Sequence, residues 1–162
     1  MRKILLVFLC VNTFINCQSV SKDTFSKEAL NDQFISFNGD SISFKSILEK
    51  HAGKDILIDV WASWCKDCIE SFPKLKELQK SYPKLDYVFL SLDKSKSKWL
   101  KGIDNYNLTG EHYFMSSGRK GPMGKFLNLN WIPRFLLVNS KGQIVVFNAI
   151  KPNDKNLLIN LK

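Results

Sequence analysis

The chain reads Asp-Val-Trp-Ala-Ser-Trp-Cys-Lys-Asp-Cys-Ile-Glu-Ser-Phe-Pro from residue 59 to residue 73. This stretch contains two cysteines, Cys65 and Cys68, with two residues between them. The largely apolar run 56–61 before them has the length and the branched side chains of a buried strand, and residues 65–81 have the spacing of a helix. The sequence therefore predicts that the two thiols lie where a strand ends and a helix begins.

This placement of the cysteines favours thiol–disulfide exchange. The attacking species in exchange is the thiolate, and a helix N-terminus stabilises negative charge through its free N–H groups and its dipole. We therefore expect Cys65 to be the nucleophile. Cys68 lies about one helical turn further on, close enough to form a disulfide with Cys65 and to resolve a mixed disulfide. The spacing suits a reversible dithiol/disulfide pair.

Two cysteines at this spacing could also be part of a metal site. A structural zinc site usually needs four Cys or His ligands. The remaining cysteines and histidines are not paired at ligand spacing: Cys10, Cys17, His51 and His112. We therefore predict no metal site, and we expect His51 to be an ordinary exposed histidine. One alternative stays open, a copper-delivery module that binds Cu(I) through its two thiolates, because folding could bring a third ligand near them.

The stretch Trp61-Ala62-Ser63-Trp64-Cys65-x-x-Cys68 resembles the active-site signature of thioredoxin-fold proteins, particularly the extracytoplasmic TlpA/ResA-like thiol–disulfide oxidoreductases. Ile132-Pro133, followed by the apolar residues 135–138 and by Gly142, looks like the cis-proline loop, the next strand and the glycine turn of that family. The resemblance covers roughly residues 30–160. It implies an α/β protein of thioredoxin-like fold, with a central mixed β-sheet flanked by helices.

The resemblance also implies roles for residues outside the cysteine pair. Asp59, six residues before Cys65, matches the buried aspartate that relays a proton to or from the inner cysteine. Pro133 matches the cis-proline that shapes the docking groove and keeps metal from the thiols. The backbone of Ile132 would offer an N–H and a C=O to an extended segment of the substrate.

Two tryptophans stand beside these motifs. Trp64 and Trp131 would form an apolar rim around the substrate, although Trp131 could instead only pack against the protein.

The chain departs from the family pattern at two places. Ser71 stands where TlpA/ResA-like proteins commonly have Glu three residues after the second cysteine, and Glu70 is one place early. The pair between the cysteines is Lys66-Asp67, without proline. Neither a role in cytochrome maturation nor a reduction potential can therefore be transferred to this chain.

The length of 162 residues and the hydrophobic content of 44% predict one domain. Residues 34–37 and 41–44 flank the turn sequence Asn-Gly-Asp and predict an N-terminal β-hairpin. Residues 110–112 are expected to form a polar loop, and residues 115–124 a mobile surface loop. The net charge of +9 comes from scattered lysines without a nucleic-acid motif, so we predict no nucleic-acid binding.

The N-terminus has the pattern of an export signal. A positive start and a short apolar core predict a signal peptide over residues 1–17, followed by a linker over 18–32 and a thioredoxin-like domain over 33–162. Residues 14–17 resemble a loose bacterial lipobox, so both plain cleavage and lipidation of Cys17, with membrane attachment, stay open.

These features together predict an exported thiol–disulfide oxidoreductase of the periplasm or cell envelope, acting as a reductant of protein disulfides. We expect it to need no bound cofactor and to receive electrons from a membrane or periplasmic thiol reductase. Oxidants and isomerases share this scaffold and differ in reduction potential. A peroxiredoxin is disfavoured, because its characteristic Thr-containing loop does not surround Cys65.

Overall fold

The structure is a computed structural model that describes residues 22–161. The strands are β1 Gln33–Ser36, β2 Ser41–Ser43, β3 Ile56–Trp61, β4 Asp86–Ser91, β5 Glu111–Phe114, β6 Arg134–Val138 and β7 Ile144–Ala149. The helices are α1 Lys27–Asn31, α2 Phe44–Lys50, α3 Lys66–Ser81, α4 Lys96–Tyr106, the 3-10 turn η1 Gly118–Lys120, α5 Pro122–Phe126 and α6 Lys155–Asn160.

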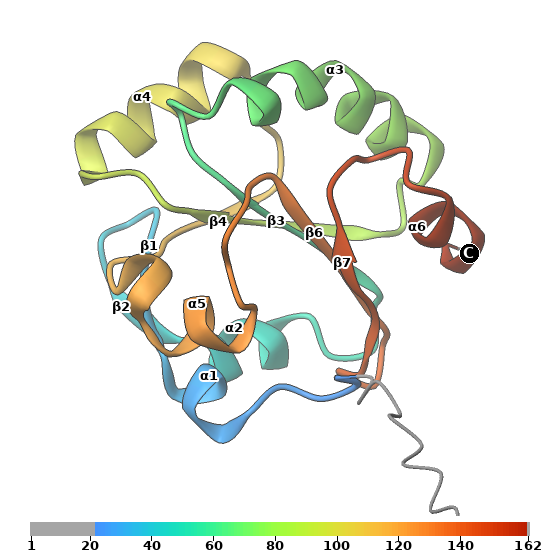
Figure 1. Cartoon of the computed structure of the whole chain (residues 1–162), viewed down its shortest axis with the longest axis horizontal. Helices are drawn as coiled ribbons and strands as arrows, with labels where there is room; N and C mark the ends of the chain where they lie inside the picture. The colour runs from blue at the N-terminus through green and yellow to red at the C-terminus, as the bar shows by residue number, and fades with distance from the viewer. Residues whose placement is uncertain (1–21, 162) are drawn as a thin grey trace, which may run out of the picture.

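The strands form one sheet in the order β2-β1-β5-β4-β3-β6-β7. β3 pairs in parallel with β4 and antiparallel with β6, so the sheet is mixed. Helices α3 and α4 cover one face of the sheet, α1, α2 and α5 lie on the other, and α6 lies beside the edge strand β7 (Figure 1). The predicted thioredoxin-like fold with a mixed, helix-flanked sheet is confirmed.

The core strand β3 carries the active-site stretch. All six of its residues are buried, because β4 and β6 flank its two edges and helices cover both faces of the sheet. The strand ends at Trp61, and α3 begins at Lys66 with Cys65 as its N-cap residue. The predicted junction between strand and helix is therefore present, and it places the cysteine pair at the C-terminal edge of the sheet.

The predicted N-terminal hairpin joins the same sheet. β1 pairs antiparallel with β2, and the turn between them closes through a bond of 2.8 Å from Ser36 N–H to the carbonyl oxygen of Asp40. Gly39 adopts a φ of +96°, a conformation that glycine reaches without steric cost. β1 also pairs with β5, so the hairpin extends the sheet beyond the central strands.

The structure differs from the expected linker over residues 18–32. Within it, residues 27–31 form α1, whose Ala29 is fully buried. The ring of Phe25 packs against Phe44 and Phe126, with centroid distances of 4.8 and 5.4 Å. The apolar residues of this polar segment therefore bury themselves against the domain, which begins earlier than residue 33.

The expectation of a polar loop over residues 110–112 is wrong, and the segment 115–124 contains helical turns as well as loop. Residues 111–114 form β5, with His112 buried, where the sequence indicated a polar loop over 110–112. The segment 115–124 is built on η1 and the first residues of α5 and is tied to the domain by Asp32, whose Oδ2 accepts bonds from Ser117 Oγ at 3.0 Å and Met123 N–H at 2.9 Å. A buried carboxylate from a distant segment thus organises what looked like a glycine-rich loop.

The predicted signal peptide and Cys17 lie outside the described residues. In the part of the chain that the structure describes, no helix is both long enough and apolar enough to cross a membrane.

Candidate active site

Cys65 and Cys68 are joined by a disulfide, with their Cα atoms 5.3 Å apart. The backbone N–H of Cys68 donates to the Sγ of Cys65 over 3.1 Å, so the sulfur caps the first turn of α3. Cys65 retains 6% of its exposure, and Cys68 is fully buried. The outer cysteine is therefore the one that a substrate can reach, and the free N–H groups of the helix N-terminus can stabilise its thiolate.

The cis-proline loop lies against the outer cysteine. The Ile132-Pro133 peptide bond is cis, as the resemblance implied. The carbonyl oxygen of Ile132 lies 3.6 Å from the Sγ of Cys65, and Ile132 itself is only 4% exposed. The structure therefore brings together the loop and the cysteine pair, which are far apart in the sequence.

Two exposed tryptophans adjoin the motifs of the site in the sequence, Trp64 next to Cys65 and Trp131 next to Ile132. Trp64 is 51% exposed and Trp131 is 57% exposed, so neither side chain serves mainly as packing. Trp131 and Pro133 line a pocket of about 420 Å³ together with the first turns of α3 and residues 150–153. This arrangement leaves apolar surface open next to the cis-proline loop.

Asp59 is buried in the middle of β3. It lies two residues before Trp61 and on the same face of the sheet, because side chains alternate along a strand. The Trp61 ring packs on Phe72 of α3, which identifies this face as the one that α3 covers. Burial raises the pKa of Asp59 well above its ordinary value. Neither carboxyl oxygen has a hydrogen-bond partner within residues 22–161, so no direct hydrogen bond joins Asp59 to Cys68.

Ser71 does not replace the charge of the family Glu. Its hydroxyl donates to the carbonyl oxygen of Cys68 over 2.7 Å. Glu70 lies on the solvent side of α3, where its carboxylate is 3.6 Å from the ammonium group of Lys66. The site is therefore without an acidic side chain at the position where the family commonly has one.

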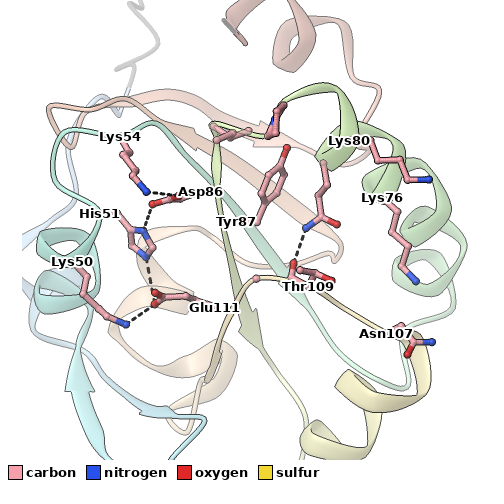
Figure 2. Close-up of a pocket in the computed structure, with 14 residues that line it drawn as sticks. Lys50, His51, Lys54, Lys76, Lys80, Asp86, Tyr87, Asn107, Thr109 and Glu111 are labelled. Atoms are coloured by element: carbon pink, nitrogen blue, oxygen red, sulfur yellow. Dashed lines mark hydrogen bonds and ion pairs between the residues drawn. The ribbon is translucent and has the colours of Figure 1, made fainter.

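A second pocket, of about 760 Å³, lies at the opposite edge of the sheet, where β4 and β5 begin (Figure 2). The expectation of an exposed His51 is wrong, since its side chain is only 5% exposed. Figure 2 shows its ring between two carboxylates: Nδ1 lies 2.7 Å from Asp86 and Nε2 lies 3.5 Å from Glu111. Lys54 and Lys50 approach the same two carboxylates at 3.1 and 2.8 Å. These contacts pin the end of α2 to the sheet.

Sequence reasoning missed this cluster and also missed Asp93, a buried carboxylate that hydrogen-bonds to the active-site loop. Both depend on acids that are distant in the sequence from the residues they contact. As regards metals, no group of three or more His, Cys, Asp or Glu side chains that could hold an ion is found among residues 22–161.

The strand-to-helix junction with its paired cysteines, and the cis-proline loop beside it, define a thioredoxin-fold protein with a dithiol site. The family model described as thioredoxin-like matches residues 53–144, which span β3 to the start of β7. The chain therefore belongs to the thioredoxin-like family.

Curated relatives share the central part of the chain. The chain is 41% identical to the thioredoxin-like protein YneN of Bacillus subtilis over 104 residues, which cover 62% of this chain and 59% of YneN. It is 28% identical to the thiol:disulfide interchange protein DsbE of Haemophilus influenzae over 104 residues, covering 64% of this chain and 55% of DsbE. The matches thus span little more than half the length of these two relatives.

Solved structures agree with the fold. A Bacteroides vulgatus protein described as a thiol-disulfide oxidoreductase superposes with a TM-score of 0.66 at 33% identity, covering 80% of this chain and 82% of that chain.

Proposed function

We propose that this protein is an exported thiol–disulfide oxidoreductase that reduces protein disulfides. The observation that carries the proposal is the Cys65–Cys68 disulfide at the N-terminus of α3, with the Ile132 carbonyl oxygen 3.6 Å from the outer sulfur. Relatives named as thiol–disulfide proteins support the same chemistry.

The reaction begins with the reduced pair. The thiolate of Cys65 attacks one sulfur of a substrate disulfide, forms a mixed disulfide and releases the other substrate sulfur as a thiolate. Cys68 then loses its proton, and its thiolate attacks the Sγ of Cys65. The Cys65–Cys68 disulfide forms, and the second substrate sulfur leaves. The substrate gains two electrons and two protons, and the enzyme becomes the disulfide form that the structure shows.

Asp59 is proposed to exchange the proton of Cys68. The carboxyl is buried on the face of β3 that α3 covers, and α3 carries the inner cysteine. Its raised pKa, caused by burial, makes the carboxylate a stronger base than an exposed aspartate. A buried thiol also needs such a base, because water cannot take its proton directly.

Substrate docking is proposed to use the backbone of Ile132 and the two exposed tryptophans. An extended segment of the substrate would pair with the loop, which places its disulfide next to Cys65. Trp64 and Trp131 would cover apolar side chains on either side of that segment.

Export to the periplasm or cell envelope is proposed from residues 1–17, and lipidation of Cys17 would attach the protein to a membrane. An exported reductant receives its electrons outside the cytoplasm, so we propose a membrane or periplasmic thiol reductase as donor. The thioredoxin-like domain of this proposal includes residues 25–31, because Phe25 and Ala29 pack against it.

The experiment that tests the function is reduction of insulin disulfides by the purified protein with dithiothreitol as electron source. We expect catalysis by the wild type and by the control Cys17→Ser, and no catalysis above background by Cys65→Ser. Full catalysis by Cys65→Ser would sink the proposal.

A further inference from the structure

Asp93 is a buried carboxylate at the same edge of the sheet as the disulfide. It follows β4 by two residues and is 5% exposed. Its carboxylate accepts a bond of 2.6 Å from the hydroxyl of Ser63, bonds of 3.2 and 3.1 Å from the backbone N–H of Ser63, and one of 2.9 Å from the hydroxyl of Ser91. Two of its three donor groups therefore belong to a single residue of the active-site loop.

Hydrogen bonds are the direct contacts that stabilise the Asp93 carboxylate among residues 22–161. Within residues 22–161, no Lys, Arg or His nitrogen lies within 4.0 Å of the Asp93 carboxylate. A buried carboxylate without a cation is costly unless its oxygens are well hydrogen-bonded. Asp93 therefore restrains Ser63, because movement of Ser63 would remove two of the three hydrogen-bond donors of the carboxylate.

Ser63 is also held from the side of α4. The hydroxyl of Tyr106 donates to the carbonyl oxygen of Ser63 over 3.3 Å. A side-chain carbon added to Gly102 would lie only 2.7 Å from the Cβ of Ser63, so the helix backbone is in close contact with the loop. The N–H, the hydroxyl and the carbonyl of Ser63 are all engaged, and Cys65 follows two residues later.

We propose that Asp93 is a positioning residue for Cys65, acting through Ser63. We call the bonds from Ser63 to Asp93 and from Tyr106 to Ser63 the clamp. The clamp fixes the turn in which Cys65 N–H donates to the carbonyl oxygen of Ala62 over 3.0 Å. This turn directs the Cys65 sulfur toward the N–H of Cys68. The proposal rests on the proposed function for the role of the Cys65 thiolate and adds what holds that thiolate at the helix N-terminus.

A loosened loop lets the Cys65 sulfur leave the N–H of Cys68. The thiolate then loses a charge-assisted hydrogen bond, so a smaller share of Cys65 is ionised at neutral pH and nucleophilic attack slows. A role confined to stability has a different signature, because it weakens folding without changing the reactivity of the folded protein.

The test is the rate at which iodoacetamide alkylates Cys65 in the reduced protein, followed by peptide-resolved mass spectrometry across neutral pH. In this reaction the thiolate sulfur bonds to carbon and iodide leaves. We expect Asp93→Ala to lower the rate at pH 7 about tenfold and Ser63→Ala about threefold. The exposed Asp104 on α4 provides the matched control, and Asp104→Asn keeps the wild-type rate.

Asp93→Asn separates position from charge. Its amide oxygen can still accept from Ser63, and its amide nitrogen can donate to Ser91, so we expect a rate within about twofold of the wild type. A rate that rises in both Asp93→Asn and Asp93→Ala would overturn the proposal, since the carboxylate would then act by repelling the thiolate.

Urea unfolding of each variant shows whether it is folded. A folded Asp93→Ala that alkylates at the wild-type rate would overturn the proposal even if its stability has fallen. If Asp93→Ala does not fold, Ser63→Ala and Tyr106→Phe are used to test the proposal. Slower alkylation of Cys65 in these variants supports it, and alkylation at the wild-type rate overturns it. Insulin reduction by the wild type is measured separately, so failure of the proposed function is distinguished from failure of this inference.

Discussion

The carbonyl oxygen of Ile132 lies 3.6 Å from the Sγ of Cys65, although 67 residues separate them in the sequence. The contact joins the cis-proline loop before β6 to the N-terminus of α3, and antiparallel pairing of β6 with β3 brings the two segments together. In the proposed mechanism, a substrate sulfur bound to Cys65 would therefore lie next to a backbone acceptor for the substrate chain.

Removal of the inner cysteine is expected to stop the reaction at the mixed disulfide. Cys68 is fully buried and Cys65 is not, so in the proposed mechanism Cys65 makes the first attack and Cys68 is needed only for release. We expect reduced Cys68→Ser to accumulate a covalent complex with insulin, visible by mass spectrometry and cleaved by dithiothreitol. Cys65→Ser serves as the comparison, and a complex formed by that variant would reverse the assigned roles.

Asp59→Asn is expected to slow resolution of the mixed disulfide at least about tenfold, since a positioned acid–base group typically contributes that much or more. The rate of insulin release in single-turnover experiments checks this. Resolution at the wild-type rate would remove Asp59 from the mechanism.

Asp59 should also make stability depend on pH. Burial raises the pKa of its carboxyl above the ordinary value of 3.8, so the folded protein binds this proton more tightly than the unfolded chain. The contribution of Asp59 to the free energy of unfolding is therefore fully present below pH 3.8 and is lost as pH rises toward the raised folded pKa. Each unit of that rise costs about 1.4 kcal/mol, and Asp59→Asn removes the loss. Urea unfolding of the oxidised protein from acid to neutral pH measures it, and parallel curves for the two proteins would show that Asp59 is not the cause.

Trp131→Ala is expected to raise KM for insulin about tenfold, because a large aromatic surface is lost from the proposed docking face. The rate of reaction with dithiothreitol, which is too small to reach the rim, should stay within about twofold. Ile159, which is 78% exposed on α6, gives the control Ile159→Ala. Equal effects of the two substitutions would mean that Trp131 does not contact the substrate.

The cluster around His51 predicts sensitivity to acid. Burial acts to raise the pKa of Asp86, but the hydrogen bonds from His51 and Lys54 and their charges outweigh it and leave the pKa lowered. The contribution of Asp86 to stability is thus present above pH 3.8 and is lost as pH falls through the lowered folded pKa. Asp86→Asn should lower the urea midpoint near neutral pH and flatten the loss in acid. Asp104→Asn is the reference variant. A urea midpoint of Asp86→Asn equal to that of Asp104→Asn would contradict this prediction.

The parts of the structure that were predictable from sequence are those with local patterns. The apolar run of β3, the spacing of Cys65 and Cys68, and the Ile132-Pro133 pair each carry their own signal within a few residues. The signal for the hairpin at Asn38-Gly39-Asp40 is equally local, because glycine readily adopts the positive φ that the turn requires.

The features that the sequence did not reveal depend on distant partners. His51 is buried because Asp86 and Glu111, which begin two other strands, meet its ring. The segment 115–124 is hydrogen-bonded to Asp32, and Ser63 is hydrogen-bonded to Asp93. No periodicity marks such contacts, since each joins two short polar stretches only after the sheet has formed.

The reduction potential of the Cys65–Cys68 pair tests the central claim most directly. The purified protein is equilibrated with dithiothreitol or glutathione buffers, and its free thiols are trapped and counted by mass spectrometry. A reductant of protein disulfides should show a potential near that of thioredoxin, about −270 mV. A potential near −120 mV would contradict the account, because the pair would then oxidise its partners.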